Sequence, residues 1–185
     1  VDTVQAEKNI EKFSSILHLE NELKKPLKNL SGGMFRRVSI VAALINDPKV
    51  LLLDEPSAGL DPKERVRFKN MLNELAQERI IFLSTHITSD IDFISKRVIF
   101  LKNGKAALND TPEKLCSCLE NSVFEVVTDA KEADNYKNNF FVVMEQQEGD
   151  AVKIRFLTNK GNMPRKEWKS VSPTLEDVYL SVYGL

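Results

Sequence analysis

The sequence VLLLDEP, at residues 50–56, joins a run of apolar residues directly to two acidic ones. A short continuous apolar run is typical of a strand that is buried on both faces of a parallel sheet. Asp54 and Glu55 would then lie at the carboxyl end of this strand, where open α/β sheets bind their ligands. An aspartate at this position suits Mg²⁺ binding beside phosphates, and the following acid suits activation of a water. The alternative is a solvated acidic pair at a strand end.

Two other segments carry candidate functional residues. Ser31 precedes Gly32 and Gly33, and this pattern predicts a capped helix whose exposed backbone N–H groups form an anion site. The alternative is a capped helix with a glycine turn and no ligand. His86 follows a second apolar run, at residues 80–83, so we expect it at the sheet edge that carries the acidic pair. The alternative for His86 is an ordinary packing or surface histidine.

The surrounding sequence predicts an α/β layer followed by a smaller α+β appendage. Apolar spacing predicts helices over residues 3–19, 34–45, 62–79 and 88–94, and strands over 50–53, 80–83 and 98–101. In the helix over 62–79, the side chains expected on the inner face are Val66, Phe68, Met71, Leu72, Leu75 and Ala76. Asn103-Gly104 predicts a hairpin turn into residues 105–108. In the appendage, strands are expected over 123–127, 140–144 and 152–156 and a helix over 174–182.

Composition and charge exclude several classes of protein. Apolar residues make up 42% of the chain and charged residues 29%, close to the average of globular domains. The formal net charge is −1, and neither half has the charge excess of a dedicated nucleic-acid binder, so no nucleic-acid partner is expected. No apolar run approaches the roughly 20 residues that span a bilayer. We therefore expect a cytoplasmic protein that reaches a membrane only through a partner.

Residues 30–62, followed by IIFLSTH at 80–86, closely resemble the ATP-binding subunit of ABC transporters. Residues 30–34 match the signature motif of that family, 50–55 its Walker B strand, 57–61 its D-loop and His86 its switch histidine. The resemblance is strong from residue 6 to about residue 112. Residues 172–179 look like the C-terminus of the subgroup whose ATPase is a chain separate from its permease.

This resemblance implies an α/β fold, namely a partial P-loop NTPase sheet with a small C-terminal α+β appendage. Residues 1–46 would form part of the helical subdomain with the signature motif. Residues 47–118 would form the C-terminal part of the ATPase core, and residues 119–185 the appendage.

The resemblance also implies ATP and Mg²⁺ as cofactors and assigns roles to individual residues. Asp54 would coordinate Mg²⁺, Glu55 would act as general base on the attacking water, and His86 would contact the γ-phosphate.

Further implied roles concern a second copy of the subunit. Ser31, Gly32 and Gly33 would reach the ATP held by the opposite subunit of a head-to-tail dimer, and Asp61 would make contact across it. Met34 stands where many members have Gln, which leaves the Ser-Gly-Gly loop intact.

A phosphate-binding P-loop, G-x-x-x-x-G-K-[ST], is absent from the 185 residues. Only Gly104 precedes a lysine, and Ala106 stands where the motif needs Ser or Thr. Thirty residues precede Ser31, too few for the family's adenine-stacking aromatic and Gln-bearing loop. We therefore expect a C-terminal fragment of an ABC ATPase that begins inside its helical subdomain. Alone it should neither bind ATP tightly nor hydrolyse it, and its remaining strands should expose apolar surface.

The favoured interpretation is an ATPase subunit that drives transport, with a lean toward export, through a separate membrane permease on the cytoplasmic face. One alternative is a soluble ABC-type ATPase that acts on DNA or ribosomes, although the chain has no coiled-coil insertion, tandem cassette or basic stripe. Another is a nucleotide-free partner that donates its Ser-Gly-Gly loop to a complete ATPase. The intact set of Asp54, Glu55 and His86 argues against that last interpretation.

Overall fold

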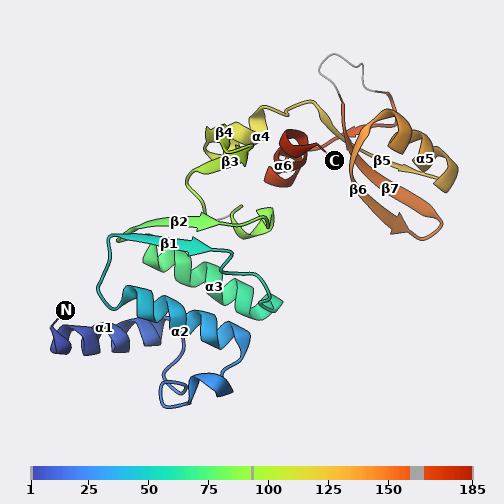
Figure 1. The fold of residues 1–185 in the computed structure, drawn as a ribbon. Coiled ribbons are helices and arrows are strands. Elements are labelled where there is room, and N and C mark those ends of the chain that lie inside the picture. The colour runs from blue at the N-terminus through green and yellow to red at the C-terminus, as the bar shows by residue number, and fades with distance from the viewer. Residues whose placement is uncertain (1, 93, 159–164, 185) are drawn as a thin grey trace. The chain divides into compact units, whose positions relative to one another are not determined.

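A computed structural model describes residues 2–92, 94–158 and 165–184 of the chain (Figure 1). The chain divides into two compact units, Val1–Ile94 and Ser95–Leu185. The candidate site residues named from the sequence all belong to the first unit. The three-part division expected at residues 46 and 118 stays a prediction.

The first unit consists of helices that pack on one side of a small parallel sheet. Its elements are α1 (Thr3–Ile16), a 3₁₀ turn η1 (Leu27–Asn29), α2 (Gly32–Leu44), β1 (Val50–Asp54), α3 (Pro62–Leu75), β2 (Ile80–Ser84) and a 3₁₀ turn η2 (Thr88–Asp90). The expected helices over 3–19, 34–45 and 62–79 are confirmed with shifted ends. The region expected as a helix over 88–94 forms only the 3₁₀ turn, and residue 93 lies outside the described residues.

Each of the three α-helices begins at a residue whose side chain accepts a backbone N–H bond from the first turn. Asp2 caps α1 and Ser31 caps α2, where its Oγ lies 3.2 Å from the Met34 nitrogen. Asp61 caps α3 through a 2.9 Å bond from the Glu64 nitrogen. Capping of this kind satisfies amide groups that have no partner within the helix. The N-cap predicted at Ser31 is therefore confirmed.

β1 and β2 pair in parallel, with Val50 opposite Ile80 and Asp54 opposite Ser84. The three helices lie in succession beneath one face of this pair, α3 nearest (Figure 1). They enclose a single apolar core, formed by Phe13, Leu17, Leu19, Ile40, Val41, Leu44, Leu51, Leu53, Phe68, Met71, Leu72 and Leu75. The parallel pairing expected of the two apolar runs is thus confirmed.

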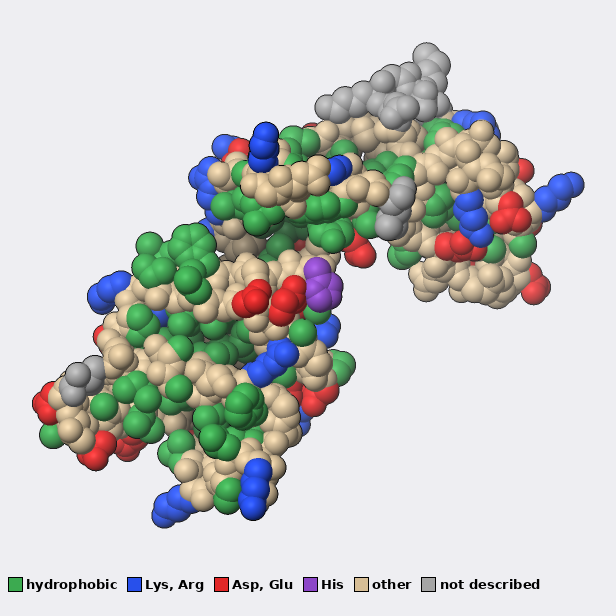
Figure 2. Space-filling model, viewed as in Figure 1, with side chains coloured by type: hydrophobic (Ala, Val, Ile, Leu, Met, Phe, Trp, Pro, Cys, Tyr) green, Lys and Arg blue, Asp and Glu red, His purple; other side chains and the backbone are tan. Residues whose placement is uncertain are grey.

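The expectation that β1 is buried on both faces is wrong. Leu53 is 9% exposed and faces the core, whereas Leu52 is 74% exposed. Ile80 and Phe82 of β2 are also more than half exposed, and Figure 2 shows hydrophobic side chains gathered over these strands. The reason is that the helices cover only one face of a pair of strands. This outcome agrees with the expectation that the remaining strands expose apolar surface.

The inner face of α3 was predicted almost correctly. Phe68, Met71, Leu72 and Leu75 are buried, and their spacing of three and four residues places them on one side of the helix. Val66 was expected with them but is exposed. It lies two residues before Phe68, and two residues correspond to about 200° of rotation around a helix.

The second unit contains a hairpin and a four-stranded antiparallel sheet. The elements are β3 (Val98–Lys102), β4 (Lys105–Asp110), α4 (Pro112–Ser117), β5 (Val123–Thr128), α5 (Ala130–Asn139), β6 (Phe141–Glu148), β7 (Ala151–Leu157), β8 (Lys169–Ser170) and α6 (Leu175–Tyr183). The larger sheet has the strand order β6-β7-β5-β8. The three strands and the final helix expected in the appendage are confirmed, whereas α5 occupies a segment expected as a polar linker.

The strand expected over 98–101 exists, but it does not extend the parallel pair. β3 instead pairs antiparallel with β4 as a separate two-stranded sheet. Asn103 and Gly104 both have positive φ, 52° and 73°, which is the backbone of a tight two-residue hairpin turn. The predicted turn is therefore confirmed, and it sends the chain straight back along β3.

An aromatic core and an ion-pair network hold the second unit together. The Trp168 indole N–H donates to the Tyr136 hydroxyl at 2.8 Å inside the core beneath the four-stranded sheet. Arg155 on β7 donates through Nε and Nη2 to the two carboxylate oxygens of Asp177 on α6, at 3.0 and 2.6 Å. This bidentate contact fixes α6 to the sheet. None of the helices in the described ranges has the length and apolarity needed to cross a bilayer.

Candidate functional site

Asp54 and Glu55 lie at the carboxyl edge of the parallel pair. Asp54 ends β1, and its carboxylate accepts a hydrogen bond from the Ser84 hydroxyl at the end of β2. The Glu55 N–H donates to the Ser84 carbonyl at 3.0 Å, so the ladder continues one residue past the strand. The register between β1 and β2 therefore fixes the backbone positions from which both acidic side chains extend.

His86 contacts Glu55 through both its backbone and its ring. The His86 backbone N–H lies 3.1 Å from the Glu55 Oε1 atom, and the ring Nδ1 lies 2.8 Å from the same oxygen. The other oxygen, Oε2, is buried and has no hydrogen-bond partner in the described part of the chain. Figure 2 shows acidic side chains beside a histidine on this face. The structure thus brings His86 to the edge that carries the acidic pair.

The signature loop lies against the segment that matches the D-loop. Gly33 approaches this segment so closely that a Cβ atom there would lie 3.1 Å from Cδ2 of Leu60, whereas a Cβ at Gly32 would meet open space. Ser31, at the start of the same helix, is exposed. A Cβ atom at residue 33 would therefore fit only if the Leu60 side chain shifted by a few tenths of an ångström, so the close packing of the two segments favours glycine at this position.

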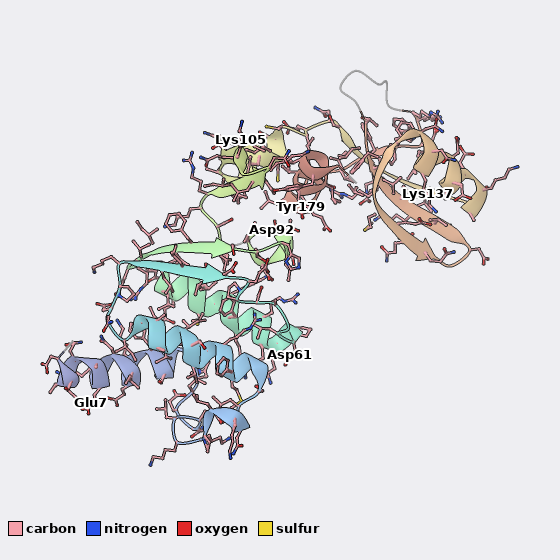
Figure 3. The ribbon with its side chains drawn as sticks, in the orientation of Figure 1. Glu7, Asp61, Asp92, Lys105, Lys137 and Tyr179 are labelled. Atoms are coloured by element: carbon pink, nitrogen blue, oxygen red, sulfur yellow. The ribbon has the colours of Figure 1, made fainter. Side chains whose placement is uncertain are left out.

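The candidate D-loop residue Asp61 lies at the start of α3, and Asp92 lies beyond the end of β2 (Figure 3). Between them the structure reveals a buried contact that sequence reasoning missed. The Ser57 hydroxyl donates to the carboxylate of Asp90, and both side chains are almost completely buried. Lys69 of α3 lies 3.5 Å from that carboxylate. The contact ties the D-loop segment to the chain just after His86.

Asp92, in the same region, is an exposed residue whose carboxyl group is partly desolvated by its neighbours. This desolvation raises the pKa of the Asp92 carboxyl above the usual range, and the nearby positive charge of Lys69 opposes that rise. Asp92 therefore gains a proton more readily than an ordinary aspartate.

As a candidate metal ligand, Asp54 would supply a single carboxylate to a bound cation. Within the described ranges, no group of three or more His, Cys, Asp or Glu side chains could hold a metal ion. Mg²⁺ commonly takes only one or two protein carboxylates and completes its shell with water and substrate phosphates. The donor set at Asp54 and Ser84 therefore fits a cation that arrives with a phosphate ligand, and does not fit a resident structural metal.

A parallel strand pair ending in Asp-Glu, a histidine bonded to that glutamate and a capped Ser-Gly-Gly helix together define part of an ABC-type nucleotide-binding domain. Residues 1–58 match the family model described as ABC transporter. The chain therefore carries a fragment of an ABC-type nucleotide-binding domain, with the corresponding partial P-loop NTPase fold.

Individual relatives extend this assignment. The chain is 31% identical over 182 residues to ABC transporter A family member 12 of Arabidopsis thaliana, a match that covers 85% of this chain and 19% of that protein. It is 35% identical over 114 residues to Nod factor export ATP-binding protein I of Sinorhizobium fredii, covering 61% and 33%. The solved structure of cbiO1 from Clostridium perfringens, part of the ABC transporter complex cbiONQ, superimposes with a TM-score of 0.55 at 30% identity, covering 60% and 45%. The chain thus spans less than half of each of these proteins.

Proposed function

We propose that this chain is part of a subunit that hydrolyses ATP and couples the hydrolysis to transport, with export as the direction, through a separate membrane permease. The contact that carries the proposal is the pair of bonds from His86 to Oε1 of Glu55. The word export in the name of the Sinorhizobium relative supports the direction, as does the resemblance of residues 172–179 to the subgroup with a separate permease.

The chemistry proposed for the edge follows from how its side chains are held. Asp54, oriented by the Ser84 hydroxyl, would hold Mg²⁺, which supplies charge neutralisation to a phosphoryl group. Because Oε1 of Glu55 accepts both bonds from His86, the carboxylate is held in one orientation. Its second oxygen, Oε2, has no hydrogen-bond partner in the described part of the chain but is buried, so it would accept a proton from a water only once the site opens to admit that water. Glu55 would therefore act as the general base, and the opposite ring nitrogen of His86 would face the γ-phosphate.

The partners in this proposal are a second ATP-binding subunit and the transmembrane permease. Ser31, Gly32 and Gly33 begin α2 at an exposed end, where backbone N–H groups and the helix dipole favour a phosphate. In a head-to-tail dimer this loop would contact ATP held by the other subunit, and Asp61 would face the same interface. The complex would lie on the cytoplasmic face of the membrane.

Taken alone, the 185-residue chain should not turn over ATP. A P-loop supplies the successive N–H groups and the lysine that hold the phosphates, and the sequence lacks that motif. A calorimetric titration of the chain with Mg·ATP should show no binding at micromolar concentrations of Mg·ATP. Micromolar affinity that disappears in Asp54→Ala would refute the expectation that the chain does not bind ATP tightly, and would support the proposed Mg²⁺ role of Asp54.

A second experiment separates a catalytic subunit from a nucleotide-free partner. An antibody against this chain would capture the natural protein from a cell extract for mass spectrometry. We expect peptides that contain a P-loop and a mass well above 21.0 kDa. A mass of 21.0 kDa, together with a co-purifying complete ATPase, would show instead that the chain acts as a partner that donates its Ser-Gly-Gly loop.

A further inference from the structure

Arg36 joins the signature helix to the backbone of Glu55. It lies on α2, five residues after the capping Ser31, and its Nη1 atom donates to the Glu55 carbonyl oxygen at 2.6 Å. The contact is partly buried and links residues that are 19 positions apart in the sequence.

Glu55 has a backbone conformation that needs such support. Its φ is +44°, in the left-handed region that residues other than glycine, asparagine and aspartate seldom occupy. A conformation of this kind persists only where the surrounding contacts enforce it, and it occurs preferentially at functional sites. Three distant segments hold Glu55: β2 binds its amide, the loop after β2 binds its carboxylate, and α2 binds its carbonyl through Arg36. The same carbonyl also accepts a longer turn bond, at 3.3 Å, from the backbone N–H of Ala58.

The neighbouring arginine has a different function. Arg37 donates to the Leu17 carbonyl at 3.1 Å and pairs with Glu64 on α3 at 3.0 Å. It therefore braces α2 against the end of α1 and against α3. Of the two adjacent arginines, only Arg36 bonds to Glu55.

We propose that Arg36 is a positioning residue that transmits the position of the signature helix to Glu55 of the same chain. A helix moves as a rigid element over one or two turns, so a shift of the Ser31–Gly33 end also moves the Arg36 guanidinium. Because the bond from Arg36 ends on the carbonyl of a strained residue, such a shift changes how well the Glu55 carboxylate is held toward His86. This role rests on the proposed function, in which the signature loop engages nucleotide and Glu55 activates water.

The test is amide hydrogen exchange of the full 185-residue chain, measured by NMR without nucleotide. The reporters are the amides of Glu55 and His86, which bond to the Ser84 carbonyl and to Oε1 of Glu55. Arg36→Met keeps much of the side-chain length and removes the donor, and should speed exchange at both amides by about tenfold, the loss expected for one charge-assisted bond. Arg36→Lys, which keeps a donor, should restore most of the protection.

Two comparisons make this result specific. Arg37→Met is the matched control on the same helix, and it should leave exchange at Glu55 unchanged relative to the amides of Met71 and Leu72 in the middle of α3. Equal acceleration of the α3 amides in Arg36→Met would reveal only a loss of overall stability and would overturn the proposal. An unchanged rate at the Glu55 and His86 amides would overturn it as well.

A double-mutant cycle tests transmission itself. Ser31→Ala removes the cap of α2 and should speed exchange at Glu55 when Arg36 is present, but add nothing in Arg36→Met. Simple additivity of the two effects would refute the link between the signature loop and Glu55. Because no nucleotide is used, these outcomes are independent of whether the proposed ATPase function is correct.

Discussion

Two neighbouring leucines of β1 allow a direct test of the bare sheet face. Leu53 is 9% exposed and packs in the core of the first unit, whereas Leu52 is 74% exposed on the opposite face. Burying a leucine side chain completely contributes about 1.5–3 kcal/mol, so the quarter of Leu52 that is buried contributes about 0.5 kcal/mol. Truncation of a buried leucine to alanine also leaves a cavity, and costs about 3 kcal/mol in total. Leu53→Ala should therefore destabilise the first unit about six times as much as Leu52→Ala.

The comparison cancels the difference in strand propensity, because both changes replace leucine with alanine in the same strand. Tryptophan fluorescence is unsuitable as the probe, since Trp168, the only tryptophan, lies in the core of the second unit. Native-state hydrogen exchange of α3 amides reports the free energy of unfolding of the first unit directly. A cost of 2 kcal/mol or more for Leu52→Ala would refute the reasoning. It would show that the outer face of β1 is covered in solution, and a cost that falls on dilution would identify the cover as a second copy of the chain.

Three further predictions concern individual polar groups. Asp177→Ala leaves Arg155 without its bidentate partner and should lower the free energy of unfolding of the second unit by about 3 kcal/mol. Urea unfolding monitored by tryptophan fluorescence measures this loss, and a loss below about 1 kcal/mol would contradict the prediction. Burial acts to raise the pKa of Glu125, but hydrogen bonds from Lys153 and Arg155 hold it below the ordinary 4.5. Ionised Glu125 therefore stabilises the second unit at pH values above 4.5, and this stabilisation is lost as the pH falls through the lowered pKa of Glu125. Glu125→Gln should flatten the acidic side of the curve of unfolding free energy against pH, and an unchanged curve there would contradict this prediction. Ser31→Ala should lower the opening free energy of α2, measured by hydrogen exchange of its amides, by about 1 kcal/mol. Unchanged exchange of these amides would show that Ser31 does not stabilise the helix as its N-cap.

The main elements of the first unit could be predicted because they depend on local sequence. The apolar runs at 50–53 and 80–83 specify two strands, and the Ser-Gly-Gly and Asn-Gly patterns specify a cap and a turn through their own backbone requirements. The meeting of His86 with the acidic pair followed from one topological rule, that parallel strands end at the same edge. The resemblance to a known family assigned roles to these residues but predicted none of the side-chain contacts between them.

What escaped prediction depends on contacts between distant segments. The bond from Arg36 to Glu55 and the buried pair of Ser57 and Asp90 join residues 19 and 33 positions apart, and no periodicity marks either of them. The exposure of Leu52 escaped for a related reason. An apolar run indicates a strand that can be buried on both of its faces, but whether both faces are covered depends on how many strands and helices surround the strand.

Ser31 and Asp61 show why a residue can serve the fold and the proposed site together. Each accepts a backbone N–H bond as the N-cap of a helix, with Ser31 Oγ at 3.2 Å from the Met34 nitrogen and Asp61 Oδ1 at 2.9 Å from the Glu64 nitrogen. A serine hydroxyl that accepts one bond still has its own proton to donate, and an aspartate that accepts through one oxygen still has the other. Capping therefore fixes the orientation of the side chain without using all of its hydrogen-bonding capacity. In the proposed dimer, Ser31 could donate to a phosphate oxygen and Asp61 could accept from the facing subunit while both helices keep their first turns intact.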